Sequence, residues 1–570
     1  MKSRSSPPVA SRLSVVHGLI GAVSLAVSHG AVATAPYMTA KNPITDEQGR
    51  ISVIVDFVDD ALLGYPGETP PPGKYVEGQE IPFFHQPQAL NLADDYEKRY
   101  GFRRAGLTSW VGTSIAAFLT PAQIRLLRED RRVRLVSDNS IGSFSADPPS
   151  PNIPPTWVGT TSGNETYSYG RNAVNGKSLI AGSTRKVYII DNGVAMHTDL
   201  GSVSSRVNVA CGNGGDCTNV LIGSTTYAPT GCYAHATHVA GIIGATANNG
   251  QGVAGVYAGV NMISVATTRS VWPFFNGLGS PSGSAGSGWC NNQSADYGTV
   301  GFALDYIYQQ TWNSDGKVPI VNISMNSFAM GYNSSGIAEA NNPKLLVLVA
   351  PSQKMVGPKL VKYPGAFVVQ SAGNGDNAVG NTTVNFNACS AATNGASLGY
   401  RPNPALFPYS ADPYDGIMLV GAVHASGQPV TPSMPFFGPP YNVPHYPLTP
   451  ALSGLPAPSN YGPCVDIWAP GVFIPSTFGD HAAVGTAQTV SYLPYPNFYY
   501  SGNVFAGSSG WAFLSGTSMA APHVAGAAAY LADRFNLTTP AAIEAKVRQY
   551  SQSFFNDQGG SAAKVVQLPN

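Results

Sequence analysis

The segment from Ser515 to Gly526 constrains this chain more than any other, because it combines a serine, a proline and small residues. It reads Ser-Gly-Thr-Ser-Met-Ala-Ala-Pro-His-Val-Ala-Gly, and three further alanines follow. The small residues predict a thin helix that can be buried beside a sheet. Pro522 is expected in the first turn, where the missing N–H has no helical partner. Ser518 would then stand at the helix N-terminus, where free N–H groups favour negative charge.

A serine at a helix start can act as a nucleophile, although a buried alanine-rich helix with a serine cap would look similar. The twelve residues together resemble the nucleophile motif of the subtilisin-like serine proteases, the subtilase family, almost letter for letter. The resemblance implies that Ser518 is the nucleophile. It also implies the α/β fold class of that family, a parallel β-sheet sandwiched by helices, preceded by a small α+β (ferredoxin-like) propeptide.

An aspartate stands at the end of a predicted buried strand. Residues 186–190, Lys-Val-Tyr-Ile-Ile, are typical of a parallel sheet, and Asp191-Asn192-Gly193 follows them. Catalytic residues of open α/β sheets gather at such carboxyl ends. Asp-Asn-Gly alone is an ordinary turn, but together with residues 194–200 it resembles the segment that carries the subtilase aspartate. Asn192 replaces the usual threonine or serine and leaves the Asp191 carboxylate in place.

Residues 235–245 predict a buried helix that begins at a histidine. His235 and His238 lie at i and i+3 and could share a metal, but no glutamate follows in the zinc-protease arrangement. The segment resembles the subtilase motif His-Gly-Thr-His-Val-Ala-Gly, with Ala236 in place of the glycine. The resemblance makes His235 the catalytic base and His238 structural, and we expect no metal site here.

The three residues occur in the order Asp191, His235, Ser518, which is the order known for subtilisin. A lipase-type elbow would read Gly-x-Ser-x-Gly with the acid and the histidine after the serine, whereas Ala520 stands here. A serine needs a base to take its proton, and histidine has a suitable pKa. An acid then orients the imidazole and stabilises its charged form.

Two further segments are expected to line the substrate cleft. Ser324, Met325 and Asn326 end an apolar strand, and the resemblance implies that this edge pairs with the substrate backbone. The family often has glycine where Asn326 stands. Ser371, Ala372 and Gly373 precede Asn374, to which the resemblance gives the oxyanion donor role. Gly-Asn-Gly is also a common turn, and an aspartate at this position would instead indicate the acid-acting branch of the clan.

Residues 34–146 predict a separate small domain. Strands are expected at 51–57, 114–119 and 133–136, with helices at 90–100 and 122–127, the second one capped by Thr120-Pro121. Strand–helix–strand twice suggests a ferredoxin-like unit. The domain resembles the inhibitory (I9-like) propeptide of subtilases. This resemblance implies an intramolecular inhibitor that is cut off at or before the proline-rich linker 146–155, leaving a catalytic domain over 147–570.

Residues 1–33 have the pattern of a secretory signal peptide. Lys2, Arg4 and Arg12 precede an apolar run, and Ala31-Val32-Ala33 forms a small-x-small cleavage site, with 33–35 as the second choice. A membrane anchor is the alternative, which the glycines and histidines in the run disfavour. We therefore expect a secreted protein, extracellular or periplasmic.

The six cysteines also fit export, because an even number in a secreted chain predicts disulfides, here with fifteen possible pairings. No Cys-x-x-Cys pair is present, so a zinc cluster is not expected. No cofactor is identified from the residues. Calcium is implied by the family resemblance, but no acidic loop can be matched to a site. The cysteines are Cys211, Cys217, Cys232, Cys290, Cys389 and Cys464.

The amino-acid composition limits which classes of partner this protein is expected to bind. The chain has 570 residues, of which 11% are charged, and its formal net charge is zero, so nothing favours nucleic acid as a partner. We expect a monomeric, secreted serine endopeptidase that acts on proteins or peptides and is made as a self-processed precursor. The alternative is a catalytically silent secreted binding protein on the same fold. The long loops 270–293, 429–458 and 477–509 have no role that the sequence assigns.

Overall fold

The computed structural model describes most of the chain from residue 34 onward. The described residues are 34–39, 43–66, 83–139, 141–143, 159–162, 165–209, 234–267, 294–312, 316–327, 338–356, 359–373, 414–423, 459, 465–471, 474–478, 498–499, 510–514, 516–556 and 562–570. We call residues 34–139 the N-terminal unit and the residues from 159 onward the large unit. In the described part, no helix is long and apolar enough to cross a bilayer.

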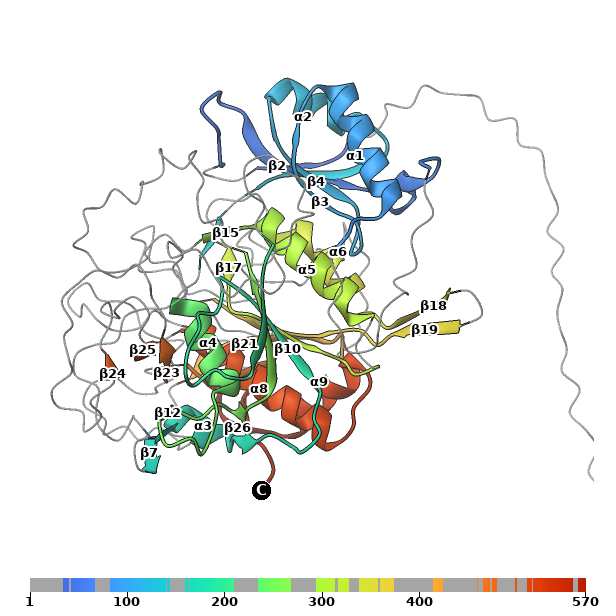
Figure 1. Ribbon diagram of the computed structural model, residues 1–570. Coiled ribbons are helices and arrows are strands. Elements are labelled where there is room, and N and C mark those ends of the chain that lie inside the picture. Colours follow the sequence, from blue (N-terminus) through green and yellow to red (C-terminus); the bar gives the residue numbers. More distant parts are fainter. Residues whose placement is uncertain are drawn as a thin grey trace, which may run out of the picture.

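A nine-stranded sheet forms the centre of the large unit (Figure 1). Its order is β11-β14-β10-β16-β20-β21-β22-β27-β26, and every pairing is parallel except that of β26 with β27. Strands β11 and β14, which follow β10 in the chain, lie on one side of β10, and the later strand β16 lies on the other side. The strand order therefore reverses at β10, so its carboxyl end is a topological switch point. The strands are β10 (Lys186–Asp191), β11 (Val203–Asn208), β14 (Asn261–Ala266), β16 (Ile320–Ile323), β20 (Phe367–Ser371), β21 (Ile417–Val423), β22 (Ile467–Pro470), β26 (Ser551–Asn556) and β27 (Ala562–Val566).

Helices cover both faces of this sheet. Those on one face are α3 (Tyr169–Val174), α4 (Ala234–Gly244), α8 (Thr517–Arg534) and α9 (Pro540–Gln549). On the other face lie α5 (Tyr297–Thr311) and α6 (Ala338–Val349). Along β10, Val187 and Ile189 point to the first face, and Tyr188 and Ile190 to the second. A strand buried on both sides must be apolar at every position, as residues 187–190 are.

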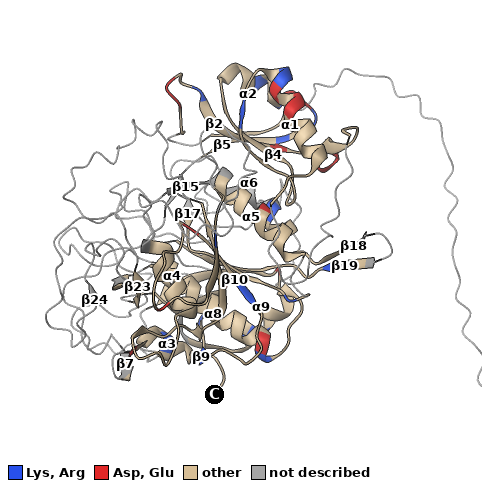
Figure 2. Ribbon diagram, viewed as in Figure 1, with Lys and Arg blue, Asp and Glu red and all other residues tan. Residues whose placement is uncertain are grey.

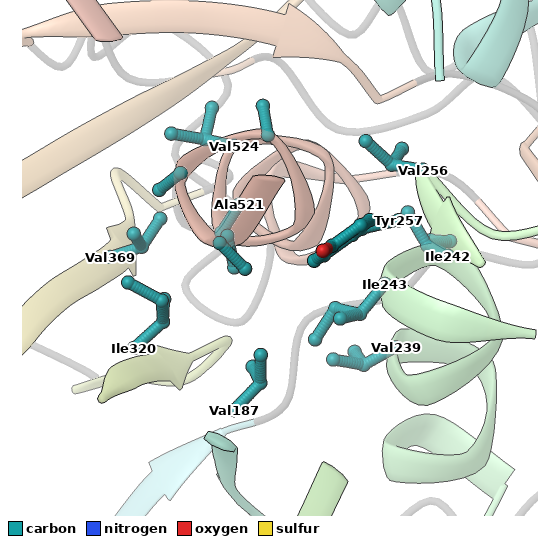
Figure 3. Packing of buried hydrophobic residues seen from close by; sticks show 14 of the residues in the cluster. Val187, Val239, Ile242, Ile243, Val256, Tyr257, Ile320, Val369, Ala521 and Val524 are labelled. Carbon is teal, nitrogen blue, oxygen red and sulfur yellow. The ribbon is translucent and has the colours of Figure 1, made fainter. Parts of the chain in front are cut away.

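Because most of its residues are small, helix α8 can lie inside the molecule rather than on its surface. Every residue of α8 from Thr517 to Ala532 is buried. Figure 3 shows Ala521 of this helix facing Val369 and Ile320 of the sheet, whereas Val524 points away from the sheet on the other side of the helix. The sequence prediction of a thin, buried helix is therefore met by the packing.

Short sheets surround this core. They comprise β7 (Gly159–Ser162), β8 (Glu165–Ser168) and β12 (Gly252–Val253); β9 (Lys177–Ser178) and β13 (Tyr257–Ala258); β18 (Ser352–Val356) and β19 (Lys359–Tyr363); and β23 (Ile474–Phe478), β24 (Phe498–Tyr499) and β25 (Gly510–Leu514). A further three-stranded sheet combines β6 (Ile141–Ser143) with β15 (Ser294–Asp296) and β17 (Asn326–Ser327).

The N-terminal unit has its own sheet, of order β1-β5-β2-β4-β3, and its own apolar cluster. The Thr120 side chain and Gln123 form a reciprocal capping box at α2, which explains why the helix begins there. In Figure 2 charged residues gather on α1, whereas the large unit is mostly uncharged. The elements are β1 (Tyr37–Met38), β2 (Ile51–Phe57), η1 (Asp59–Leu62), α1 (Pro87–Tyr100), β3 (Arg104–Thr108), β4 (Ser114–Leu119), α2 (Pro121–Arg128) and β5 (Val133–Asp138).

The N-terminal unit packs on α5 and α6, as Figure 1 shows. Asp305 of α5 is buried and accepts hydrogen bonds from the backbone N–H groups of Ser109, Trp110 and Val111. Burial raises the pKa of this carboxyl to about 7, although the N–H donors act to lower it. Lys344 of α6 forms a buried ion pair with Asp56 at 3.0 Å.

Two predicted features of the helices differ from the structure. Helix α1 begins at Pro87 rather than near residue 90. Pro522 is the sixth residue of α8, not part of the first turn, because the helix begins at Thr517. That prediction was wrong, and the reason lies in a hydrogen bond described below.

Close packing of α4 generates a stability prediction. A Cβ at Gly241 would clash with Ser476 Oγ and lie 2.9 Å from the Thr477 backbone nitrogen. Neither residue can move freely, because the Ser476 and Thr477 hydroxyls donate to carbonyls of α4. Gly241→Ala should therefore lower the free energy of unfolding by about 1–3 kcal/mol.

The measurement is a denaturant titration of the purified chain. Gly201→Ala is the matched control, because nothing lies within 4 Å of a Cβ at that position. Equal midpoints for the two variants would contradict the packing explanation.

Candidate active site

Asp191 and His235 form a buried pair at the carboxyl end of β10. Asp191 is the last residue of that strand, and His235 is the second residue of α4. Both carboxylate oxygens of Asp191 lie 2.9 Å from His235 Nδ1. The Asp191 side chain is fully buried and that of His235 is 4% exposed. Because a carboxylate only accepts, Nδ1 carries the proton, and Nε2 is the nitrogen left to act as a base.

Ser518 is the second residue of α8, at the positive end of the helix dipole. Its hydroxyl donates to the backbone carbonyl of Ser324 at 2.9 Å. Ser324 returns a hydrogen bond, because its own hydroxyl donates to the Ser518 carbonyl at 3.0 Å. The two serines thus hold the start of α8 against the residue that follows β16.

The reciprocal bond explains how proline is tolerated at position 522. In a regular helix the N–H of residue 522 would donate to the carbonyl of residue 518, and proline has no N–H. The Ser324 hydroxyl supplies the missing donor. Asn322 in turn donates to Ser324 Oγ at 2.9 Å and orients it. The hydrogen-bond donor that Pro522 lacks is therefore supplied by Ser324, which follows the neighbouring strand β16.

The sheet register brings the two parts of the site together. Ile190 of β10 is level with Ile323 of β16 in a parallel pair. The next residues, Asp191 and Ser324, therefore stand side by side, about 5 Å apart across the sheet. Ser324 contacts Ser518, and Asp191 contacts His235, so these two contacts lie at the same edge of the sheet.

Three other buried histidines of the large unit have different environments. His238 Nε2 lies 2.9 Å from the Ile474 carbonyl, which agrees with a structural role. His523 Nδ1 lies 2.8 Å from the Met519 carbonyl, and burial lowers its pKa to about 4. His197 is also buried with a pKa lowered to about 4. These two rings stay neutral at pH 7, which suits packing rather than proton transfer.

The segments expected to bind substrate lie around Ser518. Gly373 follows β20, and its N–H donates to the Thr517 hydroxyl at 3.1 Å. Ser371 and Ala372 are buried beside it, and Met325 is buried in the cluster under α5 and α6. Asn326 begins β17. Asn374 lies outside the described residues, as do all six cysteines, loops 270–293 and 429–458, and most of 477–509.

Strand β6 enters this region from the N-terminal side of the chain. It lies between β15 and β17 and pairs antiparallel with both. Because β17 starts two residues after Ser324, this three-stranded sheet borders the serine. Among the described residues, no group of three or more metal-ligating side chains is present.

Comparison with known protein families gives a match to the subtilase family over residues 182–562. The chain belongs to the subtilase family. The matched range includes Asp191, His235 and Ser518, and it excludes the N-terminal unit.

Individual relatives match over short segments. Subtilisin-like protease 1 of Pseudogymnoascus destructans is 42% identical over 89 residues, which is 16% of this subtilase and 16% of the relative. Subtilisin-like protease 2 of Trichophyton equinum is 39% identical over 93 residues, again 16% of each chain. These matches thus span about a sixth of the relatives' length.

A solved structure shares the fold. Fervidolysin from Fervidobacterium pennivorans, described as a keratinolytic enzyme related to subtilisin, superposes with a TM-score of 0.53 at 16% identity. The match covers 94% of this subtilase and 62% of fervidolysin. At this identity the likeness concerns the fold alone, and it agrees with the predicted parallel sheet sandwiched by helices.

Asn192 is a site residue whose role the sequence did not reveal. Its backbone N–H donates to Asp191 Oδ1 at 2.7 Å, and its side-chain oxygen accepts from the Ala236 N–H at 2.9 Å. Asn192 thus satisfies a free N–H in the first turn of α4 and ties that helix to the aspartate. Asparagine is a favoured capping residue, but Asn192 and Ala236 are 44 positions apart in the chain. No local sequence pattern could therefore predict this cap.

The Ser324 hydroxyl should contribute to both stability and activity, because it supplies the hydrogen bond that Pro522 cannot donate. Ser324→Ala leaves the buried Ser518 carbonyl without a donor, so the free energy of unfolding should fall by about 1–3 kcal/mol. Loss of this hydrogen bond should also displace Ser518, and the displacement should lower kcat by about 10- to 100-fold with little change in KM.

A double-mutant cycle provides the check. Pro522→Ala restores an N–H at the position that faces the Ser518 carbonyl, so Ser324→Ala combined with Pro522→Ala should recover most of both losses. Rates are compared per titrated active site. Strictly additive effects of the two substitutions would rule out the shared carbonyl.

Proposed function

We propose that this subtilase is a serine endopeptidase that hydrolyses peptide bonds in proteins. The observation that carries the proposal is the pairing of Asp191 with His235 Nδ1 at 2.9 Å, beside a serine at the start of a buried helix. Family membership and the similarity to subtilisin-like proteases support it. The order Asp191, His235, Ser518 is shared with subtilisin.

In this mechanism the Ser518 hydroxyl turns from the Ser324 carbonyl toward the imidazole. His235 Nε2 takes the proton as Ser518 Oγ attacks the substrate carbonyl carbon. Asp191 holds the tautomer with the proton on Nδ1 and stabilises the imidazolium that forms. His235 then protonates the leaving amine, and a water molecule releases the acyl group by the reverse sequence.

The negative oxygen of the intermediate needs hydrogen-bond donors. The Ser518 N–H belongs to the first turn of α8, whose N–H groups have no partner within the helix. We assign the second donor to the Asn374 side chain, because Asn374 follows Gly373 and the Gly373 N–H bonds to Thr517. This role of Asn374 rests on the family resemblance and on that neighbouring contact.

We further propose secretion and a precursor form. The pattern of residues 1–33 supports a signal peptide, and the six cysteines support disulfides in an oxidising compartment. Calcium binding and a monomeric state remain predictions from the family resemblance and composition. A catalytically silent binding protein is the competing function, and the intact Asp191–His235 pair argues against it.

Removing the nucleophile tests the activity. Ser518→Ala should abolish peptide hydrolysis and covalent labelling by a fluorophosphonate probe, because it removes the hydroxyl that would attack the substrate or the probe. Ser204→Ala is the control, since Ser204 lies on β11 and its hydroxyl bonds to Asn261. A parental chain that takes up no probe would support the silent binding protein.

We propose that the N-terminal unit is the inhibitor of this enzyme. It caps α5 and α6 through Asp305 and Lys344, and β6 continues from it into the sheet beside Ser518. A substrate that pairs with β15 and β17 would need the place that β6 takes. The unit would therefore block the site until it leaves.

Asp305 gives a quantitative test of this inhibition. Asp305→Ala leaves three backbone N–H groups without their acceptor, so inhibition by the cleaved N-terminal segment should weaken at least about tenfold. Asp305→Asn keeps the shape of the side chain and leaves a neutral acceptor. Its inhibition constant should therefore lie between those of the parental chain and Asp305→Ala. The inhibition constant is measured at pH 8, where the carboxyl is ionised. An unchanged constant with unchanged kcat would overturn this docking contact.

A further inference from the structure

We propose that His197 and Asp199 are positioning residues for the reaction, because they fix the strand that leads into Ser518. This inference rests on the proposed function and goes beyond its three catalytic residues. The mechanism uses neither side chain, yet His197 is only 8% exposed and Asp199 is fully buried. Both belong to the segment that leaves β10 after Asp191, whereas the strand that they contact belongs to the serine side of the site.

His197 donates a hydrogen bond to Gly510, the first residue of β25. Its Nδ1 lies 3.0 Å from the Asp199 backbone nitrogen, whose N–H can only donate, so Nδ1 carries no proton. The other ring nitrogen, Nε2, therefore carries the proton and donates to the Gly510 carbonyl at 2.8 Å. Burial lowers the pKa of His197 to about 4, so the ring stays neutral at pH 7 and keeps this tautomer.

Asp199 accepts a hydrogen bond from the next residue of β25. The indole Nε1–H of Trp511 donates to Asp199 Oδ2 at 3.2 Å. The carboxylate also accepts from the Val253 backbone N–H at 2.9 Å and from the Asn249 side chain at 2.6 Å. Burial raises the pKa of Asp199 to about 6, although these N–H donors act to lower it. At pH 8 the group is therefore an ionised acceptor. We call the contacts of His197 with Gly510 and of Asp199 with Trp511 the β25 clasp.

The local packing is built around the indole of this clasp. The rings of His197 and Trp511 meet edge to face, with their centroids 5.2 Å apart and their planes at 84°. Gly252 borders the hydrogen bond, and a Cβ at that position would clash with both Trp511 Nε1 and Asp199 Oδ2. The φ of Gly252 is 60°, a conformation that favours glycine. The lack of a side chain at position 252 thus gives the indole access to the carboxylate.

Strand β25 connects the clasp to the nucleophile. The strand ends at Leu514, and Thr517 begins α8 after only two further residues. Along its whole length β25 pairs antiparallel with β23. The Ser476 and Thr477 hydroxyls of β23 donate to carbonyls of α4, the helix that carries His235. A fixed β25 therefore gives the start of α8 a defined position relative to the catalytic base.

The clasp should influence the chemical step more than substrate binding. Its hydrogen bonds go to β25, whereas the substrate is expected to pair with β15 and β17. Release of β25 would displace Ser518 from His235 and leave that main-chain pairing in place. A displacement of about 1 Å at a reacting group can cost about 100-fold in rate. The expected signature is therefore a lower kcat with KM nearly unchanged.

Two substitutions of Asp199 separate positioning from folding, with rates measured at pH 8 per active site titrated by a fluorophosphonate. Asp199→Ala removes the acceptor of the indole N–H, so kcat should fall about 10-fold or more. Asp199→Asn keeps an oxygen for Trp511 and Val253, and the Asn249 amide can turn to accept from the new NH2 group. Its kcat should stay within about threefold of the parental value. A kcat for Asp199→Ala equal to that of the parental chain would overturn the proposal.

Trp511→Phe examines the same hydrogen bond from its other partner, so the test does not depend on the folding of Asp199→Ala. It removes the Nε1–H and keeps an aromatic ring against His197, and kcat should fall about fivefold or more at unchanged KM. Tyr167→Phe is the matched control, because it also removes a donor from an aromatic ring, and that donor bonds to the Asn248 side chain. Its kcat should not change. The same kcat in both variants would contradict the role of the indole.

A double-mutant cycle tests whether the two residues act through one contact. If they do, Trp511→Phe should lower kcat little further in a chain that already carries Asp199→Ala. Losses in kcat that simply multiply would refute the shared contact. Labelling of the parental chain is measured first, and a parental chain that takes up no fluorophosphonate defeats the proposed function itself. A labelled parental chain whose kcat is insensitive to both substitutions defeats the positioning role alone.

Discussion

The paired hydrogen bonds between Ser324 and Ser518 are the contact on which the site depends. They join the end of β16 to the start of α8, and each serine donates one bond and accepts one. Ser324 is level with Asp191 in the sheet, so the same contact sets how far Ser518 lies from the Asp191–His235 pair. The contact exists because a proline at position 522 leaves a buried carbonyl that only a neighbouring element can satisfy.

The burial of α8 explains why this helix is made of small residues. Its sixteen residues from Thr517 to Ala532 are all buried, so it has no solvent-facing side on which long polar side chains could lie. Gly516 precedes it with φ of 146°, a conformation that other residues rarely adopt, and this lets the chain turn sharply into the helix. Ser518 is thereby held at a helix start that is itself enclosed by strands and α4, where dipoles act with little screening by water.

The sequence was sufficient for features that depend on local pattern or on motif resemblance. The strand before Asp191, the helix that begins near His235 and the thin helix after Ser518 each have a periodicity or composition that one segment contains. The Ser324 bond, the Asn192 cap and the acceptor role of Asp305 join residues that are 44 to 196 positions apart, so no local pattern records them. Pro522 was misplaced for the same reason: proline is tolerated in the second turn only because Ser324 supplies a donor from another strand.

Two buried charged groups of the large unit, Lys344 and Asp305, lie where the N-terminal unit docks. Lys344 with Asp56, and Asp305 with the N–H groups of residues 109–111, are buried only while the N-terminal unit is in place. A buried ion pair adds little net free energy, because water would solvate both partners after separation. Its effect is to exclude docking arrangements that would leave a charge unpaired. Such contacts fix how the N-terminal unit sits on α5 and α6, and therefore where β6 enters the sheet beside Ser518.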